Sequence, residues 1–245
     1  MIQILRRLRE HLYNCITELY WRSLTTKYLF DAPQGEYQPL PRQKRYDRTL
    51  RADETIARWD HMNEYMQNFD IKSLKDIGCC MGYFCHSAAE QGFQTFGFDR
   101  NLRFVSICNM TSDRMRLSGK ESFSLFNATP ETIQYLPTTD VTILLSVWHH
   151  WYFEFGYERA LRMLEEIITK TEKILFFECG EEEIWKEFDF PELKPGQTAS
   201  DWIESQLNKM RNVEVERLAL SNTASYSHYS KKNQRTLFVL KTNHD

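Results

Sequence analysis

The chain of 245 residues is long enough to bury a sizeable core without disulfide bonds. Its mean hydropathy of −0.56 excludes an integral membrane protein, and its nine glycines and seven prolines exclude collagen-like and low-complexity classes. The net charge of −3 argues against a general nucleic-acid binder, but it is unevenly placed: residues 1–58 hold eleven Lys/Arg and seven Asp/Glu, whereas the remainder holds 20 and 27.

The N-terminal residues 1–24 have helical periodicity, with an apolar stripe and four arginines that lie off it. An amphipathic helix of this kind ordinarily packs on its own domain. The alternative is a helix that lies on an anionic membrane surface or on a partner. Residues 31–45, with three prolines and one glycine, are predicted to be a linker or an ordered loop. The apolar stripe consists of Ile2, Leu5, Leu8, Leu12, Ile16 and Leu19.

Beyond the linker, the chain alternates between short apolar strands and amphipathic helices. This alternation predicts an α/β fold with a mostly parallel sheet, covered by helices on both faces. The last two strands have no helix between them, which predicts an antiparallel hairpin at one sheet edge. The expected strands are 73–77, 95–98, 122–126, 141–147, 173–178, 213–220 and 236–241. The expected helices are 49–68, 83–91, 102–116, 131–135, 157–171 and 199–210. We divide the chain into an N-terminal extension over 1–54 and a domain over 55–245.

The six cysteines form no CxxC pair, so no metal site is expected. A chain of this size needs no disulfide framework, which favours a reduced, cytoplasmic compartment. The first residues lack the apolar segment of a secretory signal peptide. The longest apolar run, over 141–148, is too short to span a bilayer.

A glycine-bearing turn over residues 75–84, KDIGCCMGYF, follows the first predicted strand. In a doubly wound sheet this is the place where a nucleotide binds. The dinucleotide pattern GxGxxG fails, because Cys80 and Tyr83 stand at two of its glycine positions, and the P-loop pattern is absent. The arrangement of Asp76, Gly78, Cys80 and Gly82 instead resembles motif I of the class I S-adenosylmethionine (SAM) methyltransferases, with Cys80 in place of the middle glycine.

Two further strand ends agree with this resemblance. Asp99 ends the second strand, where a carboxylate can accept hydrogen bonds from both ribose hydroxyls; a solvated strand end is the alternative. Asn127 and Ala128 follow the third strand, where methyltransferases often carry an aspartate that meets the adenine amino group. The side-chain oxygen of Asn127 can also accept this bond.

The resemblance covers roughly residues 55–241 and implies the seven-stranded methyltransferase sheet, with the last strand inserted antiparallel and SAM as the cofactor. The carboxylate of SAM needs a donor, and Arg58 on the preceding helix is a candidate; an exposed helix charge is the alternative. The remaining candidate cofactor-binding residues, Tyr83, Arg100 and Ser146, belong to the loops at the ends of the first, second and fourth strands.

The stretch after the fourth strand, over residues 148–157, contains six aromatic residues that can pack against the following helix. His149 and His150 lie within it, at the carboxyl end of the strand and therefore in the predicted crevice. One is expected to face the crevice and the other to form a hydrogen bond. Methyl transfer to a hydroxyl benefits from a general base with a pKa near 7, so His149 or His150 is the predicted base or acceptor-binding residue.

The motif SVWHHW, together with Glu178 at the end of the fifth strand, is similar to methyltransferases of bacterial cell-surface glycan synthesis, including enzymes that cap O-antigen chains. This resemblance implies that the methyl group goes to a hydroxyl or phosphate oxygen of a saccharide, glycolipid or small metabolite. It also implies that the enzyme acts at the inner face of the membrane.

Two alternative functions stay open. The GYF after motif I is shared with tRNA-modifying methyltransferases, and the basic N-terminal part could contact RNA phosphates, although the acidic remainder argues against a large RNA footprint. The departures at Cys80 and Asn127 also allow a non-catalytic SAM-fold interaction protein. The sequence gives no indication of oligomeric state.

Overall fold

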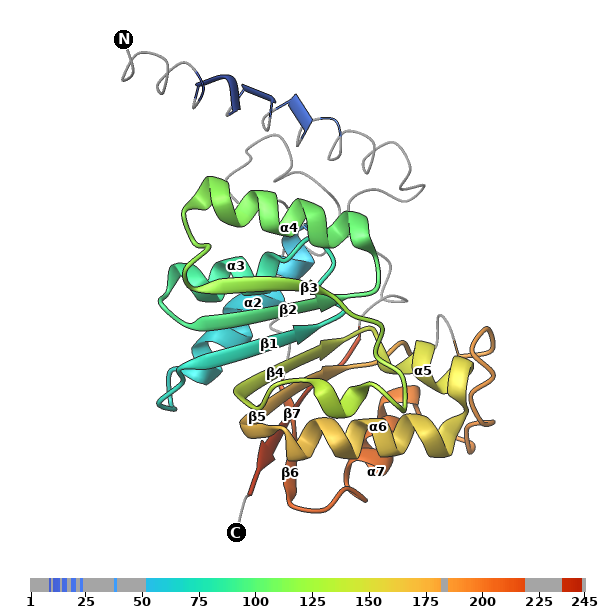
Figure 1. The fold of residues 1–245 in the computed structure, drawn as a ribbon. Helices are drawn as coiled ribbons and strands as arrows, with labels where there is room; N and C mark the ends of the chain where they lie inside the picture. Colours follow the sequence, from blue (N-terminus) through green and yellow to red (C-terminus); the bar gives the residue numbers. More distant parts are fainter. Residues whose placement is uncertain are drawn as a thin grey trace.

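The computed structural model describes residues 52–181, 185–218 and 235–243, together with single residues and short runs between 9 and 38. Seven strands form one sheet in the order β3-β2-β1-β4-β5-β7-β6 (Figure 1). The strands are β1 (Ser73–Ile77), β2 (Gln94–Asp99), β3 (Glu121–Leu125), β4 (Thr139–Leu145), β5 (Thr171–Glu178), β6 (Val213–Leu218) and β7 (Leu237–Thr242). The helices are α2 (Ala52–Met66), α3 (Tyr83–Glu90), α4 (Leu102–Met115), the 3-10 turn η1 (Ile133–Tyr135), α5 (Trp148–Phe155), α6 (Tyr157–Thr169) and α7 (Ala199–Leu207).

The predicted sheet is confirmed. The strands β1 to β5 run parallel, and β7 pairs antiparallel with both β5 and β6. The interior strand β5 is buried on both faces, and successive side chains alternate between those faces. Phe176 packs in the core under α2, α3 and α4, and Phe177 packs in the core under α5, α6 and α7. The molecule therefore has three layers, with helices on both sides of the sheet (Figure 1).

The largest departure from the predicted elements is α5. Residues 148–155 were expected to be a loop but form a helix, separated from α6 only by Gly156 at φ 80° and ψ 162°. This helix forms because Trp148 and Trp151, one turn apart, are both buried in the core. The strand β4 ends at Leu145, two residues earlier than expected, because Ser146 turns the chain with a φ of 59°.

The N-terminal part of the chain is described only in pieces. The described residues between 9 and 23 are helical and exposed. Within the predicted linker, the described residue is Gln38, which is buried and whose Oε1 accepts a hydrogen bond of 3.3 Å from the backbone N–H of Tyr83. The rest of the predicted helix over 1–24 and of the linker lies outside the described residues. Among the described helices, none has the length and apolar character needed to cross a membrane.

Candidate active site

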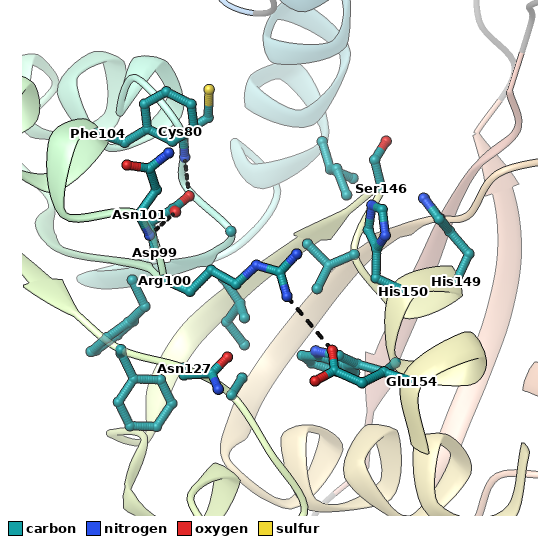
Figure 2. A pocket seen from close by; sticks show the side chains of 18 of the residues that line it. Cys80, Asp99, Arg100, Asn101, Phe104, Asn127, Ser146, His149, His150 and Glu154 are labelled. Atoms are coloured by element: carbon teal, nitrogen blue, oxygen red, sulfur yellow. Dashed lines mark hydrogen bonds and ion pairs between the residues drawn. The ribbon is translucent and has the colours of Figure 1, made fainter. Parts of the chain in front are cut away.

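A cavity of about 610 Å³ lies at the carboxyl ends of β1, β2 and β4, next to the loop that follows β3 (Figure 2). The order of the sheet reverses between β1 and β4, which is where open α/β sheets bind their ligands. The volume falls within the usual range of small-molecule sites. Nine predicted site residues line the cavity: Gly78, Cys80, Asp99, Arg100, Asn127, Ala128, Ser146, His149 and His150. Four others, Arg58, Asp76, Gly82 and Tyr83, lie outside its lining.

The loop after β1 has the backbone that its glycine spacing predicts. Gly78, Cys80 and Gly82 have φ values of 80°, 49° and 74°. A Cβ on Gly78 would lie 2.5 Å from the Cγ2 of Val147, so only glycine fits there. Cys80 adopts the left-handed conformation with a side chain, which costs roughly 1 kcal/mol, and its backbone N–H points to Asp99.

Asp99 connects the ends of β1 and β2. Its Oδ2 accepts a hydrogen bond of 2.9 Å from Cys80 N, and its Oδ1 accepts one of 2.8 Å from Asn101 N. Burial raises the pKa of Asp99, while these backbone donors and the charge of Arg100 act in the opposite direction. The carboxylate is thus held in one orientation at the cavity wall (Figure 2).

Asp76 is buried beneath this loop, and its Oδ2 has no hydrogen-bond partner among the described residues. Burial, followed by the charge of Asp99, raises the pKa of Asp76 to about 8. A buried carboxyl without a partner is costly. It becomes favourable when a cation reaches it, and this fits the ammonium group of a bound amino-acid moiety such as that of SAM.

We expect Asp76→Asn to stabilise the ligand-free protein at pH 7. With a native pKa of about 8, the carboxyl keeps its proton in the folded protein while the unfolded chain loses it. This lowers the free energy of unfolding by roughly 1.4 kcal/mol for each pH unit above the unfolded pKa, or by about 4 kcal/mol at pH 7. Asparagine avoids this cost but buries an amide that itself needs partners, at about 1–3 kcal/mol. The expected net gain in the free energy of unfolding is about 1–3 kcal/mol.

Chemical denaturation at several pH values tests this expectation. Because the native pKa of Asp76 is raised, the advantage of asparagine should shrink as the pH falls towards about 4, where the carboxyl becomes protonated in the unfolded state as well. A variant that is less stable than the wild type at pH 7 would contradict the assigned environment of Asp76.

The two histidines lie in the first turn of α5 and have different surroundings. His149 is 4% exposed, and its Nδ1 accepts a hydrogen bond of 3.1 Å from Gly180 N. Burial, together with the charges of His150 and Arg235, lowers the pKa of His149 to about 2. His150 is exposed, its ring lies 4.3 Å from that of His149, and partial burial lowers its pKa from the ordinary value. His149 thus forms a hydrogen bond to the backbone, and His150 is the more exposed of the two imidazoles that line the cavity.

His149 should make the protein sensitive to acid. Its unfolded pKa of about 6.5 lies above the native value, so the unfolded state binds an extra proton below pH 6.5 and stability falls. Between pH 7 and pH 5 this effect amounts to about 2 kcal/mol. In His149→Gln, whose amide oxygen can still accept from Gly180 N, we expect most of this loss to disappear. Unfolding of both proteins at each pH gives the difference, and equal slopes would contradict it.

Arg58 is not an exposed helix charge. Its Nε donates to Glu178 Oε2 at 2.5 Å, and its side chain is 17% exposed.

The acidic residues Asp140 and Glu178 lie at opposite ends of the sheet. Asp140, at the start of β4, accepts hydrogen bonds from the backbone N–H groups of Lys72 and Ser73, whereas Glu178 ends β5. Within the described parts of the chain, no three His, Cys, Asp or Glu side chains are grouped as metal ligands.

Several cavity residues were not predicted from the sequence. Glu154 on α5 pairs with Arg100 at 3.6 Å, and both side chains are exposed (Figure 2). Arg235 lies just before β7, distant in sequence from the rest of the site. For the aromatic residues over 148–157, the sequence predicted only that they pack against the following helix. The unpredicted lining residues also include Asn101, Phe104, Phe126, Trp151, Glu187 and Phe188.

Comparison with known proteins gives similarity of structure but not of sequence. No family model and no curated protein matches the chain. The bifunctional kinase-methyltransferase WbdD has a TM-score of 0.65 and 19% identity, over 91% of this chain and 46% of its own. The N-methyltransferase NodS from Bradyrhizobium japonicum WM9 has a TM-score of 0.54 and 10% identity, over 78% and 97%.

The magnesium protoporphyrin IX methyltransferase ChlM from Synechocystis PCC 6803, solved with bound SAM, has a TM-score of 0.52 and 13% identity, over 78% and 82% of the two chains. The present chain spans slightly less than half the length of WbdD. All three neighbours are methyltransferases, and ChlM was solved with SAM bound. The chain therefore has the class I methyltransferase fold, as its sequence predicted.

Proposed function

We propose that the protein is a SAM-dependent methyltransferase that acts on an oxygen atom, a hydroxyl or a phosphate oxygen, of a saccharide, glycolipid or small metabolite. One observation carries this proposal: a single cavity joins the loop of Gly78 and Cys80, the fixed carboxylate of Asp99 and the exposed imidazole of His150. The loop and the carboxylate suit a nucleoside with an amino-acid tail, and the imidazole suits proton removal from a hydroxyl.

The residues present fit SAM. Asp99 would accept from the ribose hydroxyls, Asn127 would meet the adenine amino group, and the buried Asp76 would attract the ammonium group. Phe98 and Phe126, with ring centroids 5.6 Å apart, give the adenine side of the cavity an apolar wall. When bound, SAM supplies an electrophilic methyl group on a sulfonium, whose departure leaves a neutral thioether.

The chain itself positions and activates the acceptor. The lowered pKa of His150 leaves its imidazole neutral at pH 7, so it can accept the proton of an acceptor hydroxyl. His149 keeps its proton on Nε2, because its Nδ1 accepts from Gly180 N. Phe188 packs edge-on against both histidine rings, and the residue after His150, Trp151, is buried.

The saccharide class of acceptor is supported by the resemblance of SVWHHW to O-antigen-type methyltransferases and by the structural likeness to WbdD. The test is a methylation assay with radiolabelled SAM on a membrane and glycan fraction. We expect label in saccharide or glycolipid that resists ribonuclease. Label lost on ribonuclease treatment would replace this acceptor with RNA. Cofactor binding without transfer to any fraction would favour a non-catalytic protein.

We also propose that residues 1–24 dock on an anionic membrane surface. The described apolar side chains of this segment, Leu12, Ile16 and Leu19, are 58–68% exposed, although such a stripe is normally covered. Basic residues beside an apolar face are typical of helices that lie in the membrane interface. The arginines of the segment are Arg6, Arg7, Arg9 and Arg22.

Co-sedimentation with vesicles tests this docking. The full chain should bind phosphatidylglycerol-containing vesicles and release in high salt, because the attraction is electrostatic. Triple replacement of Leu12, Ile16 and Leu19 by glutamine should abolish binding. A matched triple replacement of the exposed Tyr135, Leu102 and Leu125 should not. A different result is that the chain does not bind vesicles but self-associates, with this self-association abolished by the replacement of Leu12, Ile16 and Leu19. That result would identify a second copy of the chain as the partner of this segment instead.

A further inference from the structure

Behind the cavity, Glu178 forms the centre of a buried polar cluster at the end of β5. Its side chain is 2% exposed and lies between two arginines. The Nε of Arg58 donates to Oε2 at 2.5 Å, and the hydroxyl of Ser146 donates to Oε1 at 2.9 Å. Arg235 Nη1 lies 3.7 Å from Oε1. A buried carboxylate with this many donors is fixed in orientation, and it fixes its partners in turn.

This cluster holds Arg235 at the cavity. Arg235 Nη1 donates to Ser146 Oγ at 2.6 Å, and Ser146 itself turns away from β4 with a φ of 59°. The next residue, Thr236, is also fixed, because its N–H donates to the carboxylate of Glu181 at 2.5 Å. The Arg235 side chain is 19% exposed, and it lines the cavity. Much of the entropy cost of ordering a long arginine has therefore been met in the folded protein.

Arg235 differs from the other arginine of the cavity. Arg100 is 65% exposed and pairs with Glu154 at the cavity mouth. Arg235 lies further inside, near the histidines: its charge contributes to the lowered pKa of both His149 and His150. A guanidinium stays charged at all relevant pH values, and its planar fork matches the two oxygens of a carboxylate or phosphate.

We infer that Arg235, held from behind by Glu178 and Ser146, binds an oxyanion of the ligand inside the cavity. This inference rests on the proposed function, which supplies two sources for the oxyanion. One is the carboxylate of the cofactor's methionine moiety, and the other is an acidic group on the acceptor. In either case Arg235 fixes the orientation of the ligand, and Glu178 is the residue that positions Arg235.

The test compares two ligands that differ only in the carboxylate. S-adenosylhomocysteine carries it, and S-adenosyl-3-thiopropylamine lacks it. Calorimetry on the full chain should show that S-adenosylhomocysteine binds at least about tenfold more tightly than the ligand without the carboxylate. This ratio of affinities is what one charge-assisted hydrogen bond usually contributes. In Arg235→Gln this ratio should fall to near one, and in Arg235→Lys, which keeps the charge but loses the fork, it should be intermediate. Arg217→Gln, at an arginine outside the cavity lining that pairs with Asp201 and Glu204, is the control and should leave the ratio unchanged.

A second titration separates the two sources. Inorganic phosphate is titrated into protein saturated with S-adenosylhomocysteine. If the ratio of the two nucleoside affinities does not depend on Arg235, but phosphate binding is lost in Arg235→Gln, the oxyanion belongs to the acceptor. If neither depends on Arg235, the inference is wrong. If neither nucleoside binds the wild type, the proposed function fails, and phosphate binding to the ligand-free chain, with and without Arg235, still decides the inference.

Discussion

Replacing Asp99 with asparagine should weaken the binding of SAM and S-adenosylhomocysteine by about a hundredfold or more. Each charge-assisted hydrogen bond from a ribose hydroxyl is worth about 1.5–3 kcal/mol, and two are lost or weakened. The change also disturbs the loop, because both oxygens of Asp99 accept backbone N–H groups, from Cys80 and Asn101. An amide has only one acceptor oxygen, so its NH2 group would face one of these donors.

Calorimetry on folded protein measures the effect of Asp99→Asn. Glu154→Gln provides the matched control, since Glu154 also lines the cavity but pairs with Arg100 at its mouth. The control should change affinity by less than about threefold, as expected for an exposed ion pair. If Asp99→Asn binds as tightly as the control, Asp99 is not the ribose-binding residue.

Replacing His150 with glutamine should reduce turnover while leaving cofactor affinity unchanged. General bases contribute about 10²–10⁴ to rate, and this is the expected loss in kcat. Protonation of His150 removes its ability to accept a proton, so the wild-type rate should fall as the pH drops through its pKa. Because that pKa is lowered, the fall should lie below pH 6.5, and it should disappear in the variant.

His149→Gln separates this role from packing. His149 lies beside His150 and lines the same cavity, but its Nδ1 is occupied by Gly180 N. The variant should keep the acid limb of the pH profile, even if its rate is lower. An acid limb that disappears in His149→Gln and persists in His150→Gln would reverse the assignment.

The fold could be predicted from local patterns because short strands alternate with segments of helical periodicity along most of the chain. The loop from Asp76 to Gly82 was also predictable, since a left-handed backbone and close packing on Val147 demand small residues there. The helix α5 was not predicted, because a stretch dense in aromatic residues has no clear polar face. Its formation depends on the burial of Trp148 and Trp151 against distant elements.

The site was predictable where it follows strand ends and was missed where it depends on tertiary pairing. Asp99 ends β2, and His149 and His150 lie in the first turn of the helix after β4, which places them at one edge of the sheet. Arg235 joins them only because β7 inserts beside β5, which brings the residues before β7 next to Glu178. Arg58 was a candidate donor to the cofactor carboxylate, but it lies outside the cavity lining and pairs with Glu178, which is 120 residues away.

The central claim is that the cavity binds SAM, and calorimetric titration of the wild-type chain with S-adenosylhomocysteine tests it most directly. We expect one binding site per chain, with an affinity that Asp99→Asn reduces by about a hundredfold or more. The absence of binding at millimolar ligand, with protein that unfolds cooperatively, would contradict the claim.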